Sequence, residues 1–144
     1  MFLIKEKIDR TFFVSNCDIL IDQDLEEIYN YHINNSNLIT VVSALKNYKI
    51  PYGTLETELN GILKKIDEKP EIVFQINTGM YILEPEVLNF IPENVFFHIT
   101  DLIEKVMKSK GRVGVFPVSE NSWRDVGNWK DYNDLLITEG YVTK

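Results

Sequence analysis

The chain alternates short apolar runs with stretches in which apolar residues recur at helical spacing. Residues 11–15 and 38–45 are nearly continuous apolar or β-prone runs, which are typical of buried strands. Between them, apolar residues recur with the period of an α-helix at Leu25, Ile28, Tyr29 and Ile33. Asp22 stands where an N-cap is expected, and the polar residues 34–37 end the helix. The pattern predicts a central strand, a helix, and a second strand in the interior of the same sheet.

The middle of the chain predicts a β-hairpin. Asn60-Gly61 separates two strand-like runs, residues 52–59 and 62–66, and this dipeptide is the strongest short-range hairpin signal. Residues 73–83 form a further apolar strand that is interrupted at Thr78-Gly79, where we expect a kink with the glycine at positive φ. The hairpin is therefore an insertion between strands of the main sheet.

The last third predicts helices separated by one strand. The expected features are a short helix from Pro85, a helix capped by Thr100, a strand over 113–118, a polar loop over 122–127, and a last helix capped by Asn128. Strands thus alternate with helices around the hairpin. We predict an α/β layered fold with a mixed sheet flanked by helices, as a single domain over residues 1–144.

Composition and charge narrow the function classes. The 144 residues are 44% hydrophobic and 26% charged, with a formal net charge of −7, which disfavours binding to nucleic acid or to an anionic membrane. The single Cys17 excludes an intramolecular disulfide and the multi-cysteine zinc patterns. The sequence has no apolar run of membrane-spanning length, and residues 1–7 carry charge too soon to be expected to form the apolar core of a signal peptide. We expect a soluble, unsecreted protein of the reducing cytoplasm.

Several cysteine, histidine and aromatic side chains are expected to contribute to packing rather than to a functional site. Cys17 is expected to be a small buried residue, and His32 a surface or partly packed residue of the first helix. Phe96-Phe97 is expected to pack in the core. Trp129 falls on the apolar stripe of the last helix and is expected to be structural, although it could stack on a sugar or a base.

Polar residues with possible catalytic chemistry follow the predicted strands. Asp18 lies just past the end of the first strand, where open α/β sheets place their ligands, and Asp125 lies in the loop after the strand over 113–118. Glu68-Lys69-Pro70 closes the hairpin, and Asn77-Thr78-Gly79 interrupts a strand. Each of these residues or segments, taken alone, is also common in ordinary turns and strand kinks.

In their order along the chain, these segments resemble the sugar-phosphate nucleotidyltransferases. Asp18 ends a segment similar to the strand that carries the family's first metal-binding Asp. Asp125 lies in a segment similar to the loop that carries the family's second metal-binding Asp. The five matching segments are residues 13–18, 51–53, 68–70, 77–81 and 123–129. The resemblance covers nearly the whole chain and implies the family's nucleotide-diphospho-sugar transferase fold.

The resemblance implies a site for Mg²⁺ and a sugar 1-phosphate. Asp18 and Asp125 would hold Mg²⁺ and, with Lys69, form the catalytic set. The substrate-binding residues would be Gly53, Glu68, Lys69, Asn77 and Gly79. The implied reaction joins a nucleoside triphosphate to a sugar 1-phosphate with release of pyrophosphate, and the motifs favour guanylyl transfer to a hexose or heptose 1-phosphate. All these side chains are expected to open onto one cavity.

One family feature has no counterpart in the sequence. Full-length members begin with a strand and a glycine-rich loop that cradles the triphosphate, whereas the first glycine here is Gly53. The chain therefore looks like the C-terminal portion of such an enzyme, without its N-terminal strands, and is expected to be inactive alone. The uncovered sheet edge favours a homo-oligomer.

Two alternatives remain open. One is a non-catalytic binding or assembly module that retains the fold. The other is transfer of a sugar from a nucleotide-sugar, with Asp22-Gln23-Asp24 as the metal-binding pair.

Overall fold

The structure is a computed structural model and describes residues 2–138. In chain order its elements are the 3₁₀ helix η1 (Phe2–Lys7), β1 (Phe12–Ser15), β2 (Ile19–Ile21), α1 (Leu25–Asn34), β3 (Ile39–Lys49), β4 (Thr54–Thr57), η2 (Leu59–Gly61), β5 (Leu63–Asp67), β6 (Glu71–Leu83), η3 (Pro85–Phe90), α2 (Ile99–Lys108), β7 (Val113–Val118), η4 (Glu120–Ser122), β8 (Trp123–Asp125) and α3 (Trp129–Thr138). Strands and helices alternate around a hairpin, which confirms the predicted α/β class. No helix within residues 2–138 is both long and apolar enough to cross a membrane.

The main sheet has four strands in the order β1-β6-β3-β7. β6 runs antiparallel to both of its neighbours, whereas β3 and β7 are parallel, so the sheet is mixed as predicted. β3 lies in the interior, and its Ile39, Val42 and Ala44 are fully buried. The central position predicted for the first strand is wrong, because β1 is the last strand on one side of this sheet. A short apolar run has the same sequence pattern at an edge as at the centre.

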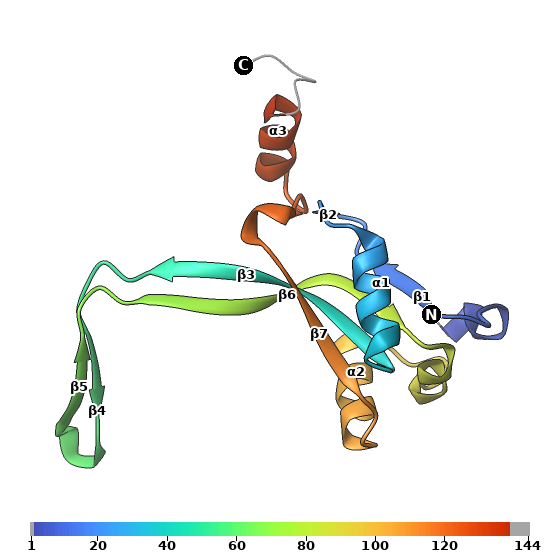
Figure 1. Ribbon diagram of the computed structural model, residues 1–144, viewed down its shortest axis with the longest axis horizontal. Helices are drawn as coiled ribbons and strands as arrows, with labels where there is room; N and C mark the ends of the chain where they lie inside the picture. The colour runs from blue at the N-terminus through green and yellow to red at the C-terminus, as the bar shows by residue number, and fades with distance from the viewer. Residues whose placement is uncertain (1, 139–144) are drawn as a thin grey trace.

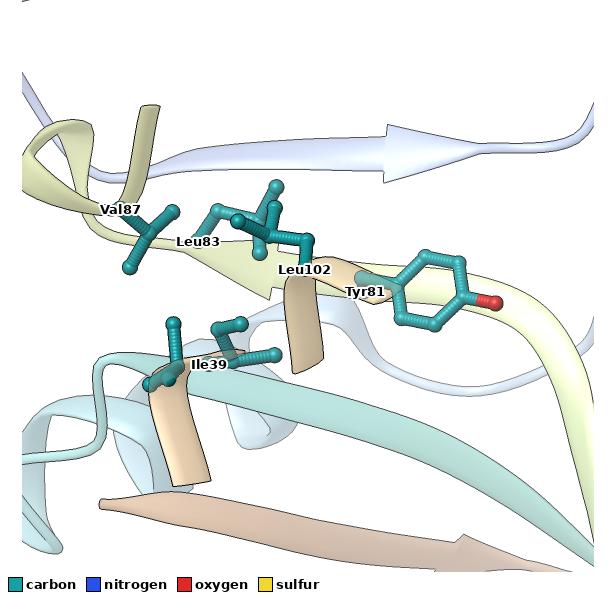
Figure 2. Close-up of a cluster of buried hydrophobic side chains, with 6 residues drawn as sticks. Ile39, Tyr81, Leu83, Val87 and Leu102 are labelled. Atoms are coloured by element: carbon teal, nitrogen blue, oxygen red, sulfur yellow. The ribbon is translucent and has the colours of Figure 1, made fainter. Parts of the chain in front are cut away.

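The two longer helices of the core cover opposite faces of the sheet. On one face, α2 contributes Leu102 and Val106 to a buried cluster with Tyr81 and Leu83 of β6 (Figure 2). On the other face, Ile28 of α1 packs with a second buried set: Val42, Ala44, Ile82 and Val118. Successive residues of β6 point to opposite faces, so Ile82 belongs to the α1 layer and its neighbours to the α2 layer.

Beyond this core, β3 and β6 continue as a two-stranded arm that carries the β4–β5 hairpin at its end (Figure 1). The hairpin is confirmed, and its turn places Asn60 at φ 69° and Gly61 at φ 79°. These are left-handed conformations that Asn and Gly adopt at low cost. Most large apolar side chains of the hairpin are exposed, Leu59 to 90%.

Two helix caps differ from the predictions. Asp24, rather than Asp22, caps α1, and its carboxylate accepts a hydrogen bond of 2.8 Å from the backbone N–H of Glu26. His98, rather than Thr100, precedes α2, and its backbone N–H donates to the Asp101 carboxylate at 3.1 Å. In both cases several residues near the helix start can serve as caps, and the backbone turn selects one of them.

Burial corrects four predictions about individual side chains. Cys17 and Phe96 are exposed, the latter to 83%, whereas His32 is fully buried. Trp129 is 79% exposed, so it does not pack in a core formed by the described residues. Periodicity identifies the apolar face of a helix, but it does not show which element covers that face.

Candidate active site

Asp18 and Asp125 are brought together by a small ladder outside the main sheet. The predicted loop over 122–127 contains a short strand, β8, which pairs antiparallel with β2. Ile19 lies opposite Asp125 in this ladder, and the backbone N–H of Val126 donates to the carbonyl oxygen of Asp18 at 2.8 Å. β2 and β8 are not predicted from the sequence, because runs of three residues are too short for a periodic signal.

The two carboxylates converge on Gly127. A Cβ atom at Gly127 would lie 3.0 Å from Oδ1 of Asp125 and 3.0 Å from Oδ2 of Asp18. Both oxygens therefore lie within 3.0 Å of one point, and the distance between them is at most twice that value. The N–H of Gly127 also donates to Oδ1 of Asp125 at 2.9 Å, which fixes that carboxylate. A side chain at this position would fill the space between the two oxygens.

This donor set fits Mg²⁺. Magnesium in proteins is commonly held by one or two carboxylates and completes its octahedron with water and substrate phosphate oxygens. Within residues 2–138 no cluster of three or more His, Cys, Asp or Glu residues could hold a metal. Asp18 and Asp125 would supply two carboxylates to such an ion.

The bulge in β6 supports the segment that carries Asp18. The register between β3 and β6 shifts between Val41 and Ser43, opposite Thr78-Gly79, and Gly79 has φ 85° as expected for this kink. The N–H of Asn16 donates to the Gly79 carbonyl at 3.0 Å, and a Cβ at Gly79 would lie 2.8 Å from Nδ2 of Asn16. The positive φ of Gly79 is the feature that favours glycine at this position, since other residues rarely adopt it.

The same bulge holds the strand that carries Asp125. Nε1 of Trp123 donates to the carbonyl of Thr78 at 3.2 Å, and the Thr78 hydroxyl donates to the Val42 carbonyl at 2.8 Å. Asn77 is bonded within β6: its Nδ2 donates to the Tyr81 hydroxyl at 2.7 Å and its Oδ1 accepts from the Gly79 N–H at 3.1 Å. Asn77 and Gly79 therefore lie in the framework next to the aspartates.

The remaining candidate residues lie elsewhere. Glu68 lies against Gly53, since its Oε2 would be 2.9 Å from a Cβ placed on that glycine. Lys69 is exposed and has φ 47°. β6 runs extended from Glu71 to Asn77, a span of about 20 Å at the rise of a strand.

Figure 1 accordingly shows the hairpin at the far end of the arm from β2. The expectation of one shared cavity is not met in this structure. Between Ser43 and Lys49 the pairing of β3 with β6 is uninterrupted, which keeps this part of β6 extended and holds Glu68 and Lys69 away from the aspartate pair.

A hollow of about 310 Å³ adjoins the aspartate pair. It is lined by Val126, Gly127, Asn128, Trp129 and Tyr132. The rings of Trp129 and Tyr132 meet edge to face with centroids 6.0 Å apart. Trp129 lines this hollow instead of packing in a core, and its place in the sequence directly after the Asp125 loop is the signal for a position near the aspartates.

One ion pair anchors the segment between β7 and β8. Nζ of Lys46, in β3, lies 2.7 Å from Oε1 of Glu120 in η4. Their hydrogen bond raises the pKa of Lys46 and lowers the pKa of Glu120. This pair ties the main sheet to the segment that leads to Asp125.

Comparison with known proteins identifies relatives among enzymes that act on sugar phosphates. Over 132 residues the chain is 32% identical to a UTP–glucose-1-phosphate uridylyltransferase of Synechocystis, covering 86% of this chain and 34% of the relative. It is 29% identical to mannose-1-phosphate guanyltransferase 2 of Candida glabrata, covering 90% of this chain and 36% of the relative. The chain thus spans about a third of the length of these relatives.

Solved structures show the same fold. HddC from Yersinia pseudotuberculosis matches with a TM-score of 0.65 at 20% identity, over 98% of this chain and 60% of that one. A glucose-1-phosphate thymidylyltransferase from Bacillus anthracis, described as putative, matches with a TM-score of 0.66 at 17% identity, over 99% of this chain and 60% of that one. The family model for nucleotidyl transferases matches residues 1–138, so the chain belongs to the nucleotidyl transferase family.

Proposed function

We propose that this chain supplies the metal-binding side of a site for sugar-phosphate nucleotidyl transfer. The observation that carries the proposal is the convergence of the Asp18 and Asp125 carboxylates on one point at Gly127. Bound there, Mg²⁺ would neutralise phosphate charge and hold the triphosphate in an orientation suited to displacement. The residues of the chain position the carboxylates through the β2–β8 ladder and the bulge in β6.

The proposed reaction is an in-line displacement. An oxygen of the sugar 1-phosphate attacks the α-phosphorus of the nucleoside triphosphate, the new phosphorus–oxygen bond forms, and the bond to the departing pyrophosphate breaks. No covalent nucleophile on the protein is required, so the exposed Cys17 has no role in this step. Catalysis of this kind depends on positioning and charge neutralisation.

The sugar side is proposed to involve the end of the arm. The Glu68 carboxylate can accept hydrogen bonds from sugar hydroxyls, Gly53 permits a close backbone approach, and Lys69 offers a point charge to the phosphate. Asn77 and Gly79 would line the path between the two groups. These residues act in one site with the aspartates only if the arm bends toward them.

We propose guanylyl transfer to a hexose or heptose 1-phosphate as the activity of the complete protein. Several relatives are named mannose-1-phosphate guanylyltransferases, which supports a guanine nucleotide as the substrate. The relative with 32% identity, however, is named a uridylyltransferase. Since the chain spans about a third of these relatives, we expect the 144 residues alone to be inactive.

Metal binding is the direct test. The purified chain is titrated with Mn²⁺, a spectroscopic substitute for Mg²⁺, and free Mn²⁺ is followed by electron paramagnetic resonance. Asp18→Asn and Asp125→Asn should each weaken binding at least about tenfold, or ~1.4 kcal/mol. Asp9→Asn removes an exposed carboxylate outside this pair and outside Asp22-Gln23-Asp24, and serves as the matched control. Equal affinity in the two pair variants and the control would refute the assignment.

The alternative is a binding or assembly module that retains the fold without catalysis. The distance between the aspartate pair and Lys69 favours it. Calorimetric titration with a nucleoside triphosphate and with a sugar 1-phosphate separates the two functions. A module of this kind binds neither ligand, or only the sugar phosphate, in the presence of Mg²⁺.

A further inference from the structure

The hollow beside the aspartate pair is lined by two aromatic rings and carries no charge of its own. Its volume is about 310 Å³, and its lining residues are Val126, Gly127, Asn128, Trp129 and Tyr132. None of these five side chains is charged. The hollow lies where α3 begins, apart from the hairpin at the end of the arm (Figure 1). The groups at the arm end are therefore not among those that a ligand in this hollow meets.

The exposure of Trp129 is the first indication of a ligand. Its side chain is 79% exposed, although large aromatic side chains are mostly buried in folded proteins. The chain's other tryptophan, Trp123, is partly buried and donates from Nε1 to the Thr78 carbonyl at 3.2 Å. Trp123 thus supports the framework, whereas Trp129 lines the hollow. Small-molecule sites are lined mainly by apolar and aromatic side chains of this kind.

The contact with Tyr132 orients the Trp129 ring. The two residues are three positions apart in α3 and lie on the same side of the helix. Their ring centroids are 6.0 Å apart and their planes meet at 80°, which is an edge-to-face contact. The two planes form a corner, against which one ring-shaped ligand can pack.

Gly127 borders both the hollow and the aspartate pair. A Cβ atom on Gly127 would lie 3.0 Å from a carboxylate oxygen of Asp18 and 3.0 Å from one of Asp125. The Cα atoms of Gly127 and Trp129 are two residues apart and hence at most about 7.6 Å from each other. A sugar 1-phosphate carries its phosphate directly on the sugar ring, so a phosphate held at the aspartates brings the ring to the hollow. A nucleobase is separated from its phosphates by the ribose.

From these observations we infer that Trp129 and Tyr132 bind the sugar ring of a hexose or heptose 1-phosphate whose phosphate is held through Mg²⁺ at Asp18 and Asp125. The apolar C–H face of the sugar packs on the aromatic rings, and its hydroxyl groups face water. The volume is near the lower end of the range for ligand pockets, which suits one sugar ring rather than a complete nucleotide. The inference rests on the proposed function and adds to it a place for the sugar that needs no bending of the arm.

Calorimetric titration of the 144-residue chain with Mg²⁺ present tests whether a ring is bound. The two ligands are mannose 1-phosphate and glycerol 1-phosphate, which carries the same phosphate ester without a ring. Mannose 1-phosphate should bind at least about fivefold more tightly, because only its ring can pack on Trp129. It should also change the tryptophan fluorescence, and this change should be lost in Trp129→Phe, which retains only Trp123.

Matched variants locate the ring. Trp129→Ala should weaken the binding of mannose 1-phosphate at least about fivefold and leave that of glycerol 1-phosphate unchanged. Trp129→Phe keeps an aromatic ring and should retain most of the affinity. Phe96→Ala removes a similarly exposed ring, at 83%, in the segment before α2 and should leave both affinities unchanged.

The outcomes separate this inference from the proposed function. Equal affinity for the two ligands, including no binding of either, or an unchanged affinity in Trp129→Ala would overturn the inference. A fluorescence change with guanosine diphosphate but not with mannose 1-phosphate would overturn it as well, since the hollow would then hold a base. In the Mn²⁺ titration Trp129→Ala should match the unmodified chain. Mn²⁺ binding that does not depend on Asp18 and Asp125 would instead refute the proposed metal site itself.

Discussion

Replacing His32 by Leu should destabilise the fold through a buried hydrogen-bond network. The His32 ring is fully buried between α1 and the sheet. Its Nδ1 lies 2.8 Å from the Thr40 hydroxyl and its Nε2 lies 3.1 Å from the Glu84 carboxylate. Thr11 also donates to Glu84 at 2.7 Å, and Nδ2 of Asn37 donates to the Thr40 hydroxyl at 3.0 Å. The network connects the residue before β1 with α1, β3 and the end of β6.

The partners fix the roles of the two ring nitrogens. The carboxylate of Glu84 only accepts, so Nε2 carries the proton and donates. In the neutral ring Nδ1 is then the acceptor, so the Thr40 hydroxyl donates to Nδ1 while its oxygen accepts from Nδ2 of Asn37. In His32→Leu, the buried Thr40 hydroxyl loses its acceptor, at about 1–3 kcal/mol, and Glu84 loses one bond, at about 1 kcal/mol. We expect a loss of about 2–4 kcal/mol in the free energy of unfolding.

Urea denaturation followed by circular dichroism measures this loss. At this chain length the loss corresponds to a fall of at least ~4 °C in Tm. Asn30→Leu makes a comparable change on the exposed side of the same helix and should stay within about 0.5 kcal/mol of the unmodified chain. If His32→Leu also stays within that range, the network contributes nothing to stability, and the reasoning is refuted.

Three further outcomes are expected. Gly127→Ala puts a methyl group 3.0 Å from both the Asp18 and Asp125 carboxylates and should weaken Mn²⁺ binding several-fold in the titration described above, whereas an unchanged affinity would mean that the metal binds elsewhere. Because Lys46 lowers the pKa of Glu120 below its ordinary value of 4.5, the stabilisation from this pair is present above that pH and is lost as the pH falls through the lowered pKa. Lys46→Met should therefore move the Glu120 titration, followed by NMR, to higher pH, and an unmoved titration would show that the pair does not form in solution. Finally, the purified chain with Mg²⁺, nucleoside triphosphates and sugar 1-phosphates should release no pyrophosphate, and measurable release would show that these residues suffice.

The local elements of this protein follow from its sequence. The continuous apolar run from Leu38 predicts the buried strand β3, and Asn60-Gly61 predicts the hairpin turn, because each depends on neighbouring residues only. The kink at Gly79 is likewise local, since its positive φ is a property of that one position. The order of the family segments along the chain indicates the family, which the match over residues 1–138 confirms.

Only the tertiary structure decides what covers each element and which distant residues meet. Asp18 and Asp125 are 107 positions apart (125 − 18), and they meet through the pairing of two three-residue strands that have no periodic signal. The hydrogen bonds of the buried His32 reach Thr40 in β3 and Glu84 directly after β6, and the edge position of β1 depends on which strands join the sheet. The uninterrupted pairing of Ser43–Lys49 with Glu71–Asn77 separates Lys69 from the aspartates, although the sequence places both in one family pattern. The spacing of residues along the chain shows only local periodicity. The contacts and positions named above arise from strand pairing and packing between segments that are remote in sequence.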